Sequence, residues 1–197
     1  MNYVIAIGIF IAILMVTFIL LIFMPKPMCY YDIDKTYPEL KIIEKEEYFN
    51  KIVEELLKDE HEKIKLIYSM GKMEMDPDTI PITFDLLKTI PYIKSVFIAT
   101  VESKSNLPKR RGSSPFANNT IRCILPLKIS SVKKTGIWTD GEIKLFQEGK
   151  WVLYDDSREN QVFNNHKYNK LYLLVLDVDR PNIYPMGIST IEHDILF

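Results

Sequence analysis

The N-terminal segment constrains the chain most, because Tyr3 to Met24 contains no charged side chain. An α-helix rising about 1.5 Å per residue over this stretch would cross the roughly 30 Å hydrocarbon core of a bilayer. The prolines of Met24-Pro25-Lys26-Pro27 indicate where such a helix ends. Its uncharged start and bulky end are unlike a cleaved signal peptide. The pattern predicts an uncleaved single-pass anchor over residues 1–24, with residues 3–24 in the membrane.

The side of the membrane on which the remaining chain lies stays open. Lys26 and Lys35 follow the apolar stretch and no basic side chain precedes it, which favours a cytoplasmic C-terminal domain. Asp32 and Asp34 lie in the same short segment and weaken this bias. The Asn118-Asn119-Thr120 triplet would be a glycosylation acceptor only on the lumenal side.

Charge and cysteine usage exclude several classes of protein. The net charge is −1 and acidic and basic residues are interspersed, so no nucleic-acid partner is expected. Cys29 and Cys123 do not form the pattern of a secreted disulfide framework, and two free thiols are predicted.

Residues 25–36 are predicted to be a linker, and residues 37–197 a single domain. Its first part is helical: Tyr37 to Glu60 has apolar residues at helical spacing, and a short helix is predicted over residues 82–90. A strand is predicted over residues 64–70 between these helices.

From Ser95 onward the pattern changes to short β-rich runs separated by turn residues. These runs are "SVFIATVES", "NTIRCILPLKI", "TGIWT", "EIKLFQ", "KWVLYDD", "QVFNN" and "KLYLLVLDV". Their spacing is typical of an antiparallel sandwich or barrel. The predicted class is α+β: an N-terminal transmembrane helix, flanking helices, then a β-barrel-like core.

Few reactive side chains are arranged for chemistry. His61, His166 and His193 do not pair with another ligand at a metal-binding spacing, so no metal site is predicted from spacing. Asp155 and Asp156 are adjacent, so in a strand they would point to opposite faces rather than into one pocket.

Four segments, in order, resemble the aspartyl/asparaginyl β-hydroxylase family, whose members are iron- and 2-oxoglutarate-dependent dioxygenases. They are "TFDLLKTIPYIKSVFIATVESKSNLPKRRG" (83–112), "IRCILPL" (121–127), "FQEGKWVLYDDSRENQVFNN" (146–165) and "LYLLVLDVDRP" (171–181). The resemblance covers most of residues 37–181. It implies a double-stranded β-helix, or jelly-roll, core.

The resemblance also implies where an iron site would lie. The two histidines that hold iron in active members fall on Ile124 and Asn160, and a third family histidine falls on Lys109 or Arg110. Isoleucine has no lone pair for a metal, and asparagine offers only a neutral amide oxygen. The sequence therefore predicts no metal ligands at these positions.

The family's 2-oxoglutarate-binding basic residue falls on Lys170 or Leu171. Lys170 could pair with a carboxylate of the cosubstrate, although without the bidentate geometry of an arginine. It is equally well interpreted as an ordinary strand-end residue.

Three functions follow. The first is a membrane-anchored, catalytically inactive relative of the hydroxylases that needs no cofactor and binds a peptide or protein. The second is a functional 2-oxoglutarate-dependent hydroxylase of a peptidyl or other substrate, which would hold Fe(II) through Asp155, Asp156 or His166. The third is a single-pass protein whose β-domain contributes to a membrane or virion-like assembly.

Overall fold

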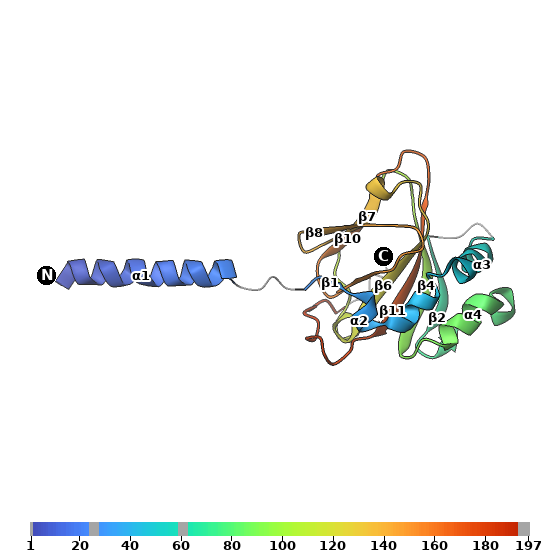
Figure 1. The fold of residues 1–197 in the computed structure, drawn as a ribbon, viewed down its shortest axis with the longest axis horizontal. Coiled ribbons are helices and arrows are strands. Elements are labelled where there is room, and N and C mark those ends of the chain that lie inside the picture. Colours follow the sequence, from blue (N-terminus) through green and yellow to red (C-terminus); the bar gives the residue numbers. More distant parts are fainter. Residues whose placement is uncertain (1, 24–27, 59–62, 193–197) are drawn as a thin grey trace.

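The computed structural model describes residues 2–23, 28–58 and 63–192. A long N-terminal helix lies apart from a domain of two antiparallel sheets flanked by short helices (Figure 1). The helices are α1 (Asn2–Phe23), α2 (Ile33–Thr36), η1 (Pro38–Ile42), α3 (Glu46–Leu56), η2 (Pro77–Thr79), α4 (Pro81–Lys88), α5 (Phe116–Asn119) and η3 (Val132–Lys134), where η marks a 3-10 helix. The strands are β1 (Tyr30–Tyr31), β2 (Ile64–Ser69), β3 (Lys72–Met73), β4 (Ile93–Val101), β5 (Ser105–Asn106), β6 (Thr120–Lys128), β7 (Thr135–Thr139), β8 (Glu142–Leu145), β9 (Val152–Tyr154), β10 (Asn160–Asn164) and β11 (Leu171–Asp179).

The apolar N-terminal segment forms α1, which confirms the predicted helix. Several of its apolar side chains, including Ile7, Phe10 and Phe18, are more than half exposed. Within the described part of the chain, however, no helix is long and apolar enough to span a membrane. The prediction of a transmembrane span is therefore not supported by the structure.

The segment predicted as a linker is partly built into the domain. β1 pairs antiparallel with β9, opposite Leu153 and Tyr154. Asp32 then caps α2, because its carboxylate accepts the backbone N–H of Asp34 at 2.9 Å. The domain therefore begins before residue 37, since β1 lies on the edge of a sheet and the side chain of Tyr31 is buried.

The two sheets confirm the predicted antiparallel core. The large sheet has the strand order β1-β9-β6-β11-β4-β2-β3, and the small sheet has the order β5-β10-β7-β8. Each of the seven predicted β-rich runs overlaps one strand, from β4 and β6 to β11. Apolar side chains from β4, β6, β9 and β11 meet those of β7 and β10 between the sheets.

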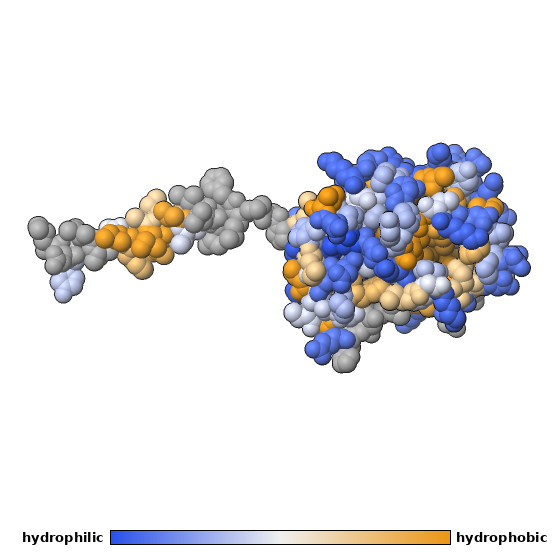
Figure 2. Space-filling model, turned by 90° about the horizontal axis from the view of Figure 1, so that it is seen from below, coloured by the Kyte–Doolittle hydropathy of each residue, from blue (hydrophilic) through white to orange (hydrophobic). Residues whose placement is uncertain are grey.

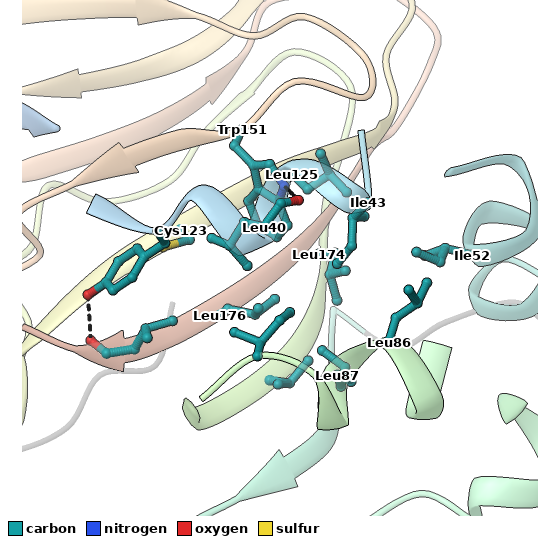
Figure 3. Close-up of a cluster of buried hydrophobic side chains, with 14 of the residues drawn as sticks. Leu40, Ile43, Ile52, Leu86, Leu87, Cys123, Leu125, Trp151, Leu174 and Leu176 are labelled. Carbon is teal, nitrogen blue, oxygen red and sulfur yellow. Dashed lines mark hydrogen bonds between the residues drawn. The ribbon is translucent and has the colours of Figure 1, made fainter. Parts of the chain in front are cut away.

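Helices cover the other face of the large sheet. In Figure 3, Leu40 and Ile43 at η1, Ile52 of α3 and Leu86 of α4 pack toward β6 and β11. The helix predicted from Tyr37 to Glu60 is divided into η1 and α3. The indole N–H of Trp151 donates to the Leu40 carbonyl at 3.0 Å, which connects η1 to the residue directly before β9.

A single acidic side chain joins the two larger helices of this layer. Glu55 of α3 accepts the backbone N–H groups of Ile82 and Thr83 at 2.8 Å, and the Thr83 hydroxyl at 2.7 Å. These amides belong to the first turn of α4 and have no partner within that helix. The carboxylate therefore caps α4 and also favours its N-terminus electrostatically.

We expect Glu55→Ala to lower the free energy of unfolding by about 2 kcal/mol, because it leaves helix-end amides without their charged acceptor. Glu54 is exposed on the same helix, so Glu54→Ala is a matched control that should change stability by less than about 0.5 kcal/mol. Chemical denaturation of both variants measures the difference. Equal effects of the two substitutions would contradict the capping role.

Candidate functional site

Ile124, which is predicted to occupy the first iron-ligand position, lies in a closed apolar core. Ile124 is on β6, paired with Val152 of β9 and Val175 of β11, and it is 0 % exposed. It belongs to the cluster between the two sheets. The buried members of this cluster are Phe97, Ala99, Val101, Ile124, Ile137, Phe146, Val152, Tyr154, Val162, Leu171, Leu173 and Val175.

The second position, Asn160, is buried at the start of β10. Its backbone exchanges two hydrogen bonds with Arg110, at 2.8 and 2.9 Å. Its side-chain N–H donates to Asp156 Oδ1 at 3.1 Å and to the carbonyl of Arg158 at 2.9 Å. The amide therefore serves as a donor that ties the corner after β9 to the first residue of β10.

Asp156 is the centre of a buried charge network formed by Arg110, Arg122, Asp156 and Asp177, which we call the Arg–Asp network. Arg110 approaches Asp156 with two nitrogens, at 3.0 and 3.2 Å. Arg122 Nη1 lies 3.2 Å from Asp156 Oδ2. Arg122 also donates to Asp177 through Nε at 2.7 Å and Nη2 at 3.0 Å. The four side chains are between 1 % and 8 % exposed.

Opposing effects act on the charges of this network. Burial alone would raise the pKa of Asp156, but Arg122 and Arg110 outweigh burial and hold the pKa below its usual value. Burial likewise disfavours the charge of Arg122, whereas Asp156 and Asp177 raise its pKa well above the ordinary range. Asp156 is therefore ionised at neutral pH, and its charge is matched by two guanidinium groups.

Asp155 belongs to a separate set of contacts, although the two acids lie in the corner after β9 and not in a strand as the predicted alternation assumed. Arg180 Nη2 donates to Asp155 Oδ1 at 2.7 Å, and Ser157 donates to the same oxygen through its backbone N–H and its hydroxyl. Arg158 Nε lies 3.5 Å from Asp155 Oδ2. The two carboxylates thus point to different partners and do not form a catalytic pair.

The two residues predicted for the third family histidine have different surroundings. Arg110 turns inward to Asp156. Lys109 turns outward, where its ammonium lies 4.1 Å from the centre of the Trp138 ring and 3.7 Å from Glu159. Arg110 is therefore the residue of this turn that lies beside Asn160.

Lys170 and Leu171 lie on different sides of the barrel wall. Lys170 pairs with Glu102 at 3.0 Å, and its side chain is 47 % exposed. Leu171 is 0 % exposed and belongs to the apolar cluster between the sheets. The residue that faces the interior thus carries no charge, and a role for Lys170 in binding 2-oxoglutarate stays a prediction.

The residues at this corner do not fit an iron ion. Ile124 offers no lone pair, Asn160 is uncharged, and the charge of Asp156 is already balanced by two arginines. Among the residues that the structure describes, no three His, Cys, Asp or Glu side chains are grouped to hold a metal. His61 and His193 lie outside the described residues.

The substitute ligands considered for an active enzyme are not brought together. His166 Nδ1 accepts the backbone N–H groups of Tyr168 at 3.3 Å and Asn169 at 3.1 Å, so it is engaged in its own turn. Asp155 and Asp156 have their separate arginine partners. These contacts favour a structural role for all three side chains.

Sequence reasoning missed the Arg–Asp network. Arg122 lies in the quoted segment "IRCILPL" and Asp177 in "LYLLVLDVDRP". Most of the residues directly before and after each of these two charges are apolar. A charged residue inside a buried strand usually has an opposite charge nearby. That signal indicates an ion pair, although it does not identify which acid meets which arginine.

Comparison with solved structures defines the class of fold. An oxidoreductase of the 2OG-Fe(II) oxygenase family from Burkholderia pseudomallei matches with a TM-score of 0.52 and 11 % identity, covering 75 % of this chain and 83 % of that one. HygX from Streptomyces hygroscopicus, solved with nickel and 2-oxoglutarate bound, matches with a TM-score of 0.51 and 9 % identity, covering 81 % and 97 %. The fold is therefore the jelly roll of 2-oxoglutarate oxygenases.

The family is shown by the sequence. Residues 32–181 match the aspartyl/asparaginyl β-hydroxylase family, and the chain belongs to this family. An ornithine lipid ester-linked acyl 2-hydroxylase from Rhizobium tropici is 28 % identical over 105 residues. That match covers 53 % of this chain and 36 % of the relative, so the chain spans only about a third of the relative's length.

We expect Asp156→Asn to lower the free energy of unfolding by about 3–5 kcal/mol, because it leaves two buried arginines facing a single buried aspartate, Asp177. The exposed Lys170–Glu102 pair provides a contrast, since Glu102→Gln should cost less than about 1 kcal/mol. Chemical denaturation at neutral pH compares the variants. A loss for Asp156→Asn no larger than that for Glu102→Gln would refute the structural importance of the network.

The lowered pKa of Asp156 also predicts a pH dependence. Its stabilising contribution is present above the unfolded-chain pKa of about 3.9 and is lost as the pH falls through the lower folded pKa. The stability difference between the unmodified protein and Asp156→Asn should therefore be constant near neutrality and narrow below about pH 4. Denaturation curves over an acid pH series test this, and a difference that widens toward low pH would contradict it.

Proposed function

We propose that this chain is a membrane-associated member of the aspartyl/asparaginyl β-hydroxylase family that lacks iron-dependent hydroxylation and acts as a binding or structural module. The observation that carries the proposal is the side chain at each ligand position. Ile124 is part of the apolar interior, and Asn160 donates a hydrogen bond to a carboxylate already paired with two arginines.

Electrostatics support the loss of metal binding. Arg110 and Arg122 place two positive charges within 3.2 Å of Asp156 oxygens, beside Asn160. An added divalent cation would be repelled by these guanidinium groups and would have to displace at least one of them. Without iron, the chemistry that activates oxygen in such oxygenases has no centre at this position.

Membrane association is the second part of the proposal. The helix α1 is uncharged, and its described apolar side chains are exposed. Leaving such a surface in water costs about 25 cal/mol per Å² of apolar area. An apolar environment around α1, as in a lipid bilayer, removes this cost. The proposed ligand of the domain is a peptide or another protein, and no nucleic-acid partner is proposed.

The alternative is a hydroxylase with substitute ligands. It would require Asp155, Asp156 or His166 to leave its present partners and converge on one metal ion. The separate contacts of these side chains give no support to that rearrangement. The alternative therefore ranks second. A metal titration distinguishes the hydroxylase with substitute ligands from the module without iron.

Titration of the full chain with Fe(II) or Mn(II) under anaerobic conditions should show no saturable binding, with or without 2-oxoglutarate. Calorimetry and thermal shift provide the measurements. The positive control is the double variant Ile124→His, Asn160→His, which restores two imidazole ligands at the family positions. Circular dichroism establishes that this variant is folded before it is titrated.

Saturable micromolar binding by the unmodified chain would overturn the proposal and favour the substitute-ligand hydroxylase. Binding by the double variant alone would support it, because the scaffold would then lack only its metal ligands. A thermal shift of the unmodified chain with 2-oxoglutarate alone, lost in Lys170→Ala, would support a retained cosubstrate subsite without a metal.

A further inference from the structure

Exposed apolar side chains gather on one face of the domain, around β1, where the chain arrives from α1. We call this the α1-proximal face. It carries four aliphatic or methionine side chains that are each at least 49 % exposed: Met28, Ile183, Met186 and Ile188. Figure 2 shows apolar surface at the end of the domain beside the chain that leads to α1, and also in a recess farther along.

Contacts of β1 bring these distant segments together. The Tyr30 hydroxyl donates to the carbonyls of Ile137 at 3.0 Å and Glu142 at 3.2 Å, which places the start of β8 beside β1. The Tyr31 ring lies 4.6 Å, centre to centre, from the ring of Tyr184 in the C-terminal segment. In Figure 1, β1, β8 and this last segment lie on the side of the domain that faces α1.

The C-terminal part of this face is held by its backbone, so its side chains have a fixed direction. Gly187 donates to the Asn118 carbonyl at 3.0 Å, and Ile188 donates to the Ser157 hydroxyl at 2.9 Å. A Cβ at Gly187 would come within 2.6 Å of Asn118 Cα, so only glycine allows this approach. Met186 and Ile188 flank the pinned glycine and remain 70 % and 49 % exposed. This segment also lies beyond the region that matches the family, residues 32–181.

The connection to α1 is short. From Phe23, where α1 ends, to Met28 the chain can reach at most about 19 Å, since consecutive Cα atoms are 3.8 Å apart. With α1 in a bilayer, the α1-proximal face cannot move far from the lipid headgroups. Nearby charged residues have both signs, including Asp32, Lys35 and Lys144, so attraction to anionic lipid is not what would hold it there.

We propose that the α1-proximal face docks on the lipid bilayer, with Ile183, Met186 and Ile188 inserted at the boundary between headgroups and acyl chains. This inference rests on the proposed membrane association of α1. It adds that the domain is held in a fixed orientation rather than tethered loosely. Aliphatic side chains without a basic surround suit insertion into an uncharged interface, to a depth of about 5–10 Å.

The test uses the full chain in phosphatidylcholine vesicles with plain or brominated acyl chains, since bromine quenches only fluorophores close to lipid. Three single substitutions, each labelled with a thiol-reactive fluorophore, report on different places: Ile11→Cys on α1, Met186→Cys on the α1-proximal face and Met70→Cys as control. Met70 is 71 % exposed, matching the 70 % of Met186, but lies in the turn between β2 and β3, at the opposite edge of the large sheet from β1. The native Cys29 and Cys123 are buried, and the unsubstituted chain measures their background labelling.

Brominated lipid should reduce the emission of the labels at residues 11 and 186 at least about twofold and leave the label at residue 70 unchanged, because only inserted positions reach the acyl boundary. Quenching at residue 11 alone would overturn docking of the domain and leave membrane association of α1 intact. No quenching at residue 11, with vesicles that float free of protein, would overturn both. A label at residue 186 that is shielded from water to the same extent in plain and in brominated vesicles would be covered by protein and not by lipid. That result would assign the face to a second copy of the chain and overturn the inference.

Discussion

The buried pairing of Arg122 with Asp156 and Asp177 holds together two strands and the corner that contains the candidate site. Arg122 is on β6, Asp177 is on the neighbouring β11, and Asp156 lies in the corner that follows β9. Charges buried this deeply are tolerated only when each has its partner, because desolvation costs several kcal/mol per ion. With Arg110 included, two arginines face two aspartates, and the set is balanced.

This balance defines the surroundings of Asn160. Asp156 is held from two directions by Arg110 and Arg122, and Asn160 then has a defined acceptor for its side-chain amide. The backbone pairing of Arg110 with Asn160 adds a link from the preceding turn to β10. The corner that would present a metal ligand in an active relative is thus stabilised by interactions that require no metal.

Most of the fold could be predicted because local patterns determined it. The strands β4 and β6 to β11 follow β-rich runs bounded by turn residues, and the run "TGIWT" coincides with β7. The predictions failed where contacts between residues far apart in the sequence determine the local structure. β1 is only two residues long and forms because β9 offers it an edge. The long predicted helix is interrupted between η1 and α3, and Trp151, far away in sequence, binds the carbonyl of Leu40 within η1.

The candidate site shows the same division between local and distant information. The identities of Ile124 and Asn160 were readable in the sequence, since the flanking motifs set the register. Their consequences were not, because the partners of Asp156 come from three separate segments: Arg110 from the turn before Gly112, Arg122 from β6 and Asn160 from β10. The inward residue at the start of β11, Leu171, could be told from Lys170 only once the strand had a known orientation.

The two replacements differ in kind, and their surroundings explain the difference. Without a metal, a histidine at position 124 would be a buried polar group among Val152, Val175 and their apolar neighbours, and such a group costs free energy when unpaired. Isoleucine removes that cost and adds apolar contacts. Position 160 faces a carboxylate instead, so an apolar residue there would leave Asp156 short of a donor, whereas asparagine supplies a neutral N–H and leaves the charge balance of the Arg–Asp network unchanged. Each residue therefore suits its present neighbours, and none of the contacts described for Ile124 and Asn160 depends on a metal ion.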